Sequence, residues 1–223
     1  MELSVIARMK SAFSGKYGIP RQSGLVSNLR STIIFEPPYR VLEALRGIEG
    51  FSHLWIIWGF SENLRDSWSP TVRPPRLGGN LRMGVFATRS SFRPNAIAIS
   101  SVKLDGLETT EQFGTVIHVL GADLMDGTPI YDIKPYLAFT DAHPEATNGF
   151  AEGVKSHRLE VEIPEAYGAM LDDSLLASLR EVLAQDPRPA YQHDPERVYG
   201  FSFSGFEVRF CVDENRLKVL EIR

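Results

Sequence analysis

The chain contains a single cysteine, Cys211, among its 223 residues. A lone cysteine excludes a disulfide within the chain and any zinc or iron–sulfur site built from clustered cysteines. The five histidines never occur at H-x-x-x-H or H-E-x-x-H spacing, so we expect no metal site. The most apolar run, LWIIWGF at 54–60, is far shorter than the roughly eighteen residues that a membrane helix requires. We therefore expect a soluble, cytoplasmic protein.

The common nucleotide-binding and hydrolase motifs are absent as well. The sequence has no G-x-G, which excludes the dinucleotide fingerprint and the glycine-rich loop of Rossmann-type methyltransferases. It also has no Walker loop and no G-x-S-x-G elbow that would activate a serine. These enzyme classes are therefore disfavoured.

Acidic side chains are missing from one long stretch, although the net charge of the chain is −4. No carboxylate occurs between Asp66 and Asp105, and residues 1–104 carry 14 basic and 6 acidic side chains. The cations of the acid-free stretch are Arg73, Arg76, Arg82, Arg89, Arg93 and Lys103. Such a run indicates either an anionic partner or pairing with the acidic C-terminal half.

Turn residues punctuate the chain at short intervals, with 18 glycines and 14 prolines. The segments between them are short and often alternate between apolar and polar residues, which is typical of β-strands. The pattern predicts a mainly β fold, with a single closed β-barrel over residues 1–150 and one short helix at 39–47, closed by Gly47. The predicted strands are 3–9, 31–35, 52–60, 84–88, 96–104, 114–124 and 131–136.

A polar connection at 137–165 separates the barrel from a predicted small α+β domain at 165–223. Asp172 or Asp173 is expected to cap a helix whose apolar stripe includes Leu179 and Leu183, and DPRP at 186–189 is expected to end it. The alternating residues at 208–212 and 217–222 predict a terminal hairpin.

Two polar motifs could carry chemistry. In the first, prolines and glycines form a rigid loop from which Arg73, Arg76 and Arg82 project, an arrangement that suits phosphate groups. The alternative is an ordinary loop with solvated arginines.

The second motif is DGTPIYDIKPY at 126–136. Alternate residues of a strand face the same side, so Asp132, Lys134 and Tyr136 would share a surface fed by the turn Asp126-Gly127-Thr128. A carboxylate, an ammonium group and a phenol together offer proton acceptance and positioning. The alternative is an exposed salt bridge beside a tyrosine, and residue spacing alone does not favour the catalytic group over this salt bridge.

Five segments together resemble a known family: GIPRQSGLV, GIEGFSHLWIIWGF, PTVRPPRLGGNLRMGVFATRSSFRPN, DGTPIYDIKPY and EVLAQDPRPAY. They are similar to the TsaA-like β-barrel tRNA (adenine-N6)-methyltransferases over almost the whole chain. The resemblance implies an S-adenosyl-L-methionine (SAM) dependent enzyme, usually a homodimer. The family methylates N6 of threonylcarbamoyladenosine next to the tRNA anticodon.

The resemblance also implies a set of cofactor-binding residues. Two departures from the family pattern accompany it: many members have histidine in place of Ser61, and proline and glycine in place of Ala96 and Ala98. The implied SAM-binding residues are Arg21, Gln22, Ser61, Glu62, Arg89, Ser90, Phe92, Ile99, Leu124, Asp126, Gly127 and Thr128.

For catalysis, we expect Asp132 or Asp126 to accept the N6 proton, with Lys134 and Tyr136 orienting the carbamoyl group. The residues expected to bind the anticodon stem-loop are Arg73, Arg76, Arg82, Arg188 and Tyr191. The acidity of the C-terminal half predicts a limited role for that half in RNA contact.

Two other functions remain open at the level of sequence. One is a noncatalytic barrel that binds a nucleotide or RNA. The other is a methyltransferase of the same fold with a different substrate.

Overall fold

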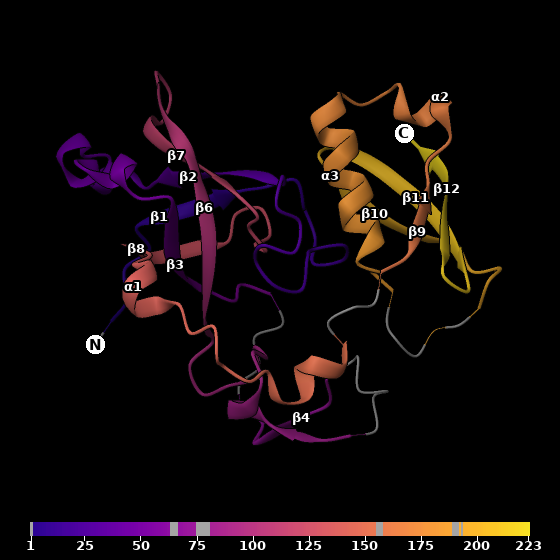
Figure 1. Cartoon of the computed structure of the whole chain (residues 1–223). Helices are drawn as coiled ribbons and strands as arrows, with labels where there is room; N and C mark the ends of the chain where they lie inside the picture. The colour runs from indigo at the N-terminus through magenta and orange to yellow at the C-terminus, as the bar shows by residue number, and fades with distance from the viewer. Residues whose placement is uncertain (1, 63–66, 75–80, 155–157, 189–191, 193) are drawn as a thin grey trace.

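The computed structural model describes residues 2–62, 67–74, 81–154, 158–188, 192 and 194–223. Figure 1 shows two units, an N-terminal β unit and a C-terminal sheet covered by a helix. The mainly β fold expected from the sequence is confirmed. No helix in the described part of the chain is long and apolar enough to cross a membrane.

Six strands of the N-terminal unit are hydrogen-bonded in the order β1-β2-β7-β6-β3-β8, and β8 pairs back onto β1, so the sheet closes into a barrel. Alternate residues of each strand fill the interior, as Leu54, Ile56 and Trp58 do from β3. The strands are β1 (Ala7–Lys10), β2 (Arg30–Phe35), β3 (His53–Gly59), β6 (Ile97–Thr110), β7 (Gly114–Leu120) and β8 (Pro129–Pro135).

The prediction of a helix at 39–47 is wrong. The chain forms three separate 3₁₀ turns there, η1 (Pro37–Tyr39), η2 (Leu42–Leu45) and η3 (Ile48–Gly50). Backbone N–H groups reach carbonyls only three residues back, as from Ala44 to Val41, and Gly47 interrupts the run with a φ of +87°. The stretch is therefore too short and too broken for an α-helix.

The prediction of a strand at 84–88 is also wrong. Only β5 (Met83–Gly84) is extended, paired with β4 (Thr71–Val72), and η5 (Val85–Ala87) follows at once. The N–H of Val85 still reaches the carbonyl of Pro70, but that of Thr88 folds back onto the carbonyl of Val85. The ladder therefore ends after two residue pairs.

The C-terminal unit is a four-stranded sheet in the order β10-β11-β12-β9. The side chain of Asp172 accepts a hydrogen bond from Leu175 N at 2.8 Å, which confirms the predicted helix cap. The hairpin of β11 (Phe206–Asp213) and β12 (Arg216–Ile222) is confirmed as well. The remaining elements after β8 are α1 (Ala138–Asp141), η6 (Gly149–Val154), β9 (Glu160–Glu162), α2 (Glu165–Gly168), α3 (Asp173–Ala184) and β10 (Tyr199–Phe203).

The segment between β1 and β2 joins the two units. Phe13, Val26 and Leu29 belong to the hydrophobic core of the C-terminal sheet and α3, not to the interior of the barrel. The N–H of Ser204 donates to the carbonyl of Ala12 at 2.7 Å. Residues 11–29, which carry the PRQ motif at 20–22, are therefore held between barrel and sheet (Figure 1).

Gly18 marks the tightest contact of this junction. Its φ is +89°, and a Cβ added there would lie 2.5 Å from the Phe201 ring. We expect Gly18→Ala to lower the free energy of unfolding by about 1–3 kcal/mol, because strain and overpacking add. Urea denaturation measures the change. Gly15→Ala is the control, since no atom would lie within 4 Å of its Cβ. Equal effects of the two substitutions would contradict the close junction.

Candidate active site

The outer face of β6, β3 and β8 brings several expected site residues together. Because Leu54, Ile56 and Trp58 point into the barrel, Ile57 points outward. Ile57 pairs with Ile99 on β6 and with Asp132 on β8, so the three side chains form one row across the sheet. Ile99 is 47% exposed. The row thus combines an uncovered apolar wall with a carboxylate.

Lys134 and Tyr136 extend this face. Lys134 Nζ lies 2.7 Å from Asp132 Oδ2, and Lys134 pairs across the sheet with Trp55. The Tyr136 ring packs on Trp55, with 5.3 Å between the ring centroids. Trp55 is itself fixed, because its Nε1 donates to Asp141 Oδ2 at 2.8 Å. One connected surface around Trp55 therefore includes Asp132, Lys134, Tyr136 and Asp141.

A second cluster joins the PRQ motif to the TRSSF motif at 88–92. Arg89 Nη1 donates a hydrogen bond to Gln22 Oε1, across 67 positions of sequence. Nearby, Ser100 Oγ donates to Asp123 Oδ1 at 2.6 Å, and Trp58 Nε1 donates to Ser100 Oγ at 2.9 Å. The chain of hydrogen bonds leads from the barrel interior to the loop that carries Asp123.

Burial raises the pKa of Asp123 above its ordinary value, and the hydrogen bond from Ser100 and the charge of Arg89 oppose that shift. Asp123, Ser100 and Trp58 are not among the site residues expected from the sequence. One signal was present: Asp123 is the first acid after the apolar strand β7 and lies three residues before the DGT turn.

The DGT turn is anchored to β1. Asp126 Oδ1 accepts from Ser11 N at 3.0 Å, and Gly127 has a φ of +76°. The side chains of Leu124 and Thr128 are buried, so they shape the turn from inside. A pocket of about 250 Å³ lies beside Asp126 and Gly127. The described contacts tie the Asp126 carboxylate to Ser11, just after β1, and that of Asp132 to Lys134, which leaves the two carboxylates in separate clusters.

Arg21 and Arg188 meet at the junction of the two units. Arg21 Nη2 donates to the carbonyls of Asp186 at 3.1 Å and of Arg188 at 3.3 Å. The side chain of Arg188 is only 8% exposed, and its Nε lies 2.9 Å from Asp186 Oδ1. This burial corrects the expectation for Arg188, because a guanidinium covered and paired in this way presents no face to a tRNA phosphate.

The remaining expected residues lie on loops. Arg73 and Arg82 are exposed near the β4–β5 pair, and Ser61 and Glu62 are exposed just beyond β3. Ser90 and Phe92 lie in a tight turn, in which Phe92 N donates to Ser90 Oγ at 3.3 Å. Arg76 and Tyr191 lie outside the residues that the structure describes.

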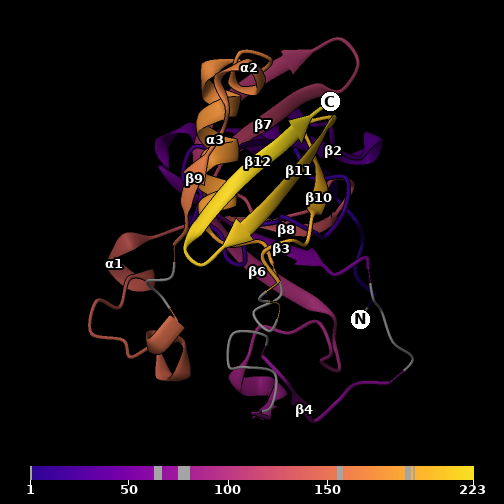
Figure 2. The ribbon, with the colours of Figure 1, turned by 90° about the vertical axis from the view of Figure 1, so that its right-hand side faces the viewer.

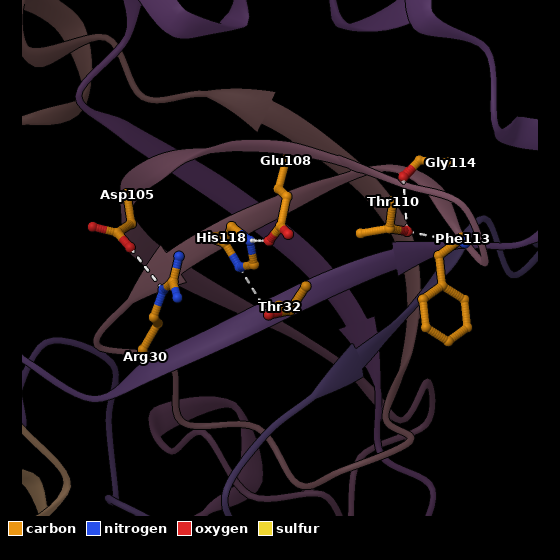
Figure 3. Close-up of polar contacts among 8 residues, drawn as sticks. All are labelled: Arg30, Thr32, Asp105, Glu108, Thr110, Phe113, Gly114 and His118. Atoms are coloured by element: carbon orange, nitrogen blue, oxygen red, sulfur yellow. Dashed lines mark hydrogen bonds and ion pairs between the residues drawn. The ribbon is translucent and has the colours of Figure 1, made fainter. Parts of the chain in front are cut away.

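A separate polar group covers the outer face of β2, β7 and β6 (Figure 3). His118 Nδ1 lies 3.0 Å from Thr32 Oγ1, and His118 Nε2 lies 2.7 Å from Glu108 Oε2. Arg30 Nε lies 2.9 Å from Asp105 Oδ2. None of the residues selected from the sequence belongs to this group, and its contacts hold the three strands together.

Asp123 makes the stability of the protein depend on pH. Its raised pKa means that the folded state binds this proton more tightly than the unfolded state does. Ionisation therefore lowers the free energy of unfolding as pH rises from the ordinary carboxyl range through the folded pKa. Relative to Asp123→Asn, the wild type should lose stability across that window and then level off. Urea titrations at a series of pH values test this, and a difference independent of pH would contradict it.

Comparison with known proteins assigns both units to one family. Residues 8–142 match the tRNA-methyltransferase O N-terminal domain, and residues 156–223 match the TrmO C-terminal domain. Among the residues that the structure describes, no group of three or more His, Cys, Asp or Glu side chains could hold a metal ion.

Individual relatives agree with this match. The tRNA (adenine(37)-N6)-methyltransferase of Escherichia coli K12 is 41% identical over 97% of this chain and 95% of its own. A putative S-adenosylmethionine-dependent methyltransferase of Pseudomonas aeruginosa is 40% identical over 93% of this chain and 91% of its own. The crystal structure of TrmO from Pseudomonas aeruginosa aligns with a TM-score of 0.79 at 32% identity, covering 100% of this chain and 98% of that one. The chain therefore belongs to the TrmO family of tRNA methyltransferases.

Proposed function

We propose that this protein transfers a methyl group from SAM to N6 of the adenosine at position 37 of tRNA, with threonylcarbamoyladenosine as the substrate nucleoside. The observation that carries the proposal is the Ile99–Ile57–Asp132 row, which joins an expected cofactor wall to an expected proton acceptor. The printed functions of the relatives favour the same reaction.

The residues present fit SAM by the chemistry of their side chains. Arg89, Gln22 and Arg21 supply donors for its carboxylate, and Arg89 and Gln22 already contact each other. Ile97 and Ile99 are exposed aliphatic side chains on one face of β6, a suitable wall for an adenine ring or an alkyl chain. When bound, SAM supplies an activated methyl group on a sulfonium. These side chains orient it, and orientation is worth roughly 7–11 kcal/mol of a bimolecular barrier.

The N6 of a carbamoylated adenosine resembles a urea nitrogen and is a weak nucleophile, so a proton acceptor should assist. Asp132 or Asp126 fills this role in our proposal, and the position of Asp132 beside Ile99 favours Asp132. Lys134 holds one Asp132 oxygen at 2.7 Å and, with Tyr136, orients the carbamoyl group.

Exposed Arg73 and Arg82, together with Arg76, bind phosphates of the anticodon stem-loop in this proposal. We further propose a cytoplasmic homodimer. A noncatalytic barrel that only binds nucleotide or RNA is the competing function.

Methyl transfer to two tRNA preparations, one with and one without threonylcarbamoyladenosine, tests the proposal. Nucleoside mass spectrometry should find a methylated product only in the first. Transfer to neither tRNA despite SAM binding would favour the noncatalytic barrel. Equal transfer to both would leave a methyltransferase with a different substrate nucleoside.

Asp132→Asn tests the proton acceptor. We expect a drop in kcat of about 100-fold or more with an unchanged KM for SAM, because the amide cannot accept the proton. Asp126→Asn, assayed in parallel, separates the two candidates. Asp105→Asn is the control, since Asp105 pairs with Arg30 on β2 and should leave kcat unchanged. Full turnover by Asp132→Asn would rule out this role.

A further inference from the structure

Trp68 and Phe86 form an exposed aromatic pair that the proposed reaction does not use. Their ring centroids lie 6.1 Å apart with 25° between the ring planes, so the rings are stacked. Trp68 is 48% exposed and Phe86 is 72% exposed. Two large aromatic side chains in solvent are unfavourable for a free protein, and such a pair commonly marks a binding surface.

The backbone holds this pair firmly beside expected site residues. The N–H of Ser69 donates to the carbonyl of Phe92 at 3.0 Å, which ties the chain after Trp68 to the TRSSF motif. Val85, directly before Phe86, is buried, and its N–H donates to the carbonyl of Pro70 at 3.0 Å. Both rings therefore project from a braced segment. Figures 1 and 2 show β4, which lies between these residues, at the same lower end of the molecule.

The charge around the pair favours a polyanion over another apolar protein surface. Exposed Arg82 lies in the same hairpin, where its Nη1 donates to Thr71 Oγ1 at 3.1 Å, and Arg73 is exposed one residue beyond β4. The chain carries no carboxylate from residue 67 to residue 104. Flat aromatic faces beside arginines are the usual means of binding unpaired bases and their phosphates.

We propose that Trp68 and Phe86 form a stacking platform for an unpaired base of the tRNA anticodon loop, next to the adenosine that is methylated. The inference rests on the proposed function for the identity of the RNA. In this arrangement the arginines bind phosphates through charge, whereas the platform binds a base through ring contact. The two contributions therefore differ in their dependence on salt.

The test uses anticodon stem-loop RNA in which 2-aminopurine replaces the unpaired loop nucleotides one at a time. One position should lose fluorescence on binding to the wild type, because the probe stacks. Trp68→Ala and Phe86→Ala should each abolish that loss and weaken RNA binding by about tenfold, with the salt slope and SAM affinity unchanged. Arg82→Ala should instead flatten the salt slope.

Two variants guard against a purely structural effect. Phe86→Tyr keeps the ring and should restore both the affinity and the fluorescence loss. Tyr39→Ala removes an exposed aromatic side chain from η1 and should change neither.

Unchanged RNA affinity and quenching in Trp68→Ala and Phe86→Ala would overturn the platform. So would a change of sedimentation state in these variants, since the pair would then be a contact between copies of the chain. The proposed function fails separately, if the wild type binds and stacks the RNA but transfers no methyl group. A wild type that does not bind the stem-loop would overturn both.

Discussion

The packing of residues 11–29 against the C-terminal sheet is the constraint on which the expected SAM site depends. Phe13, Val26 and Leu29 leave the barrel and enter the core formed by α3 and the sheet. Burial of such side chains contributes about 1.5–3 kcal/mol each, so their packing anchors the segment to the C-terminal unit. The PRQ loop is part of this segment. Its Gln22 reaches Arg89, and its Arg21 is held by two carbonyls of the C-terminal unit. The C-terminal unit thus positions a loop that belongs, by sequence, to the barrel.

Closure of the barrel divides its side chains into two sets with different roles. The inward set is mostly apolar, but it includes the buried hydroxyls of Ser31 and Ser100. Hydrogen bonds of Trp58 and Ser100 lead from this interior to Asp123. On β6, β3 and β8 the outward side chains can reach a ligand, because no described strand or helix covers Ile99. On the opposite strands the outward polar groups satisfy one another, as His118 does with Thr32 and Glu108. The strand register therefore decides which face can bind a substrate.

Much of the fold follows from alternation and turn residues, because the strands of a barrel expose one face and bury the other. The same rule correctly placed Asp132 and Lys134 on one surface. It failed where contacts distant in sequence decide the structure. The strand expected at 84–88 stops early because the N–H of Thr88 turns back to the carbonyl of Val85. The three-residue strand β9 exists because β12 pairs with it in parallel. Arg188 is expected from the sequence to contact the tRNA, yet in the fold it is buried and paired with Asp186. Asp123 was overlooked because its environment, rather than its spacing, makes it unusual.

The central claim is that the PRQ loop, the TRSSF motif and the outer face of β6 form one SAM-binding surface. Backbone hydrogen exchange, measured with and without saturating SAM, tests it most directly. The account predicts slower exchange at 19–24, 88–92 and 97–99, with little change on β2 and β7. Protection confined to β2 and β7, or to the C-terminal hairpin, would place the cofactor elsewhere and contradict the account.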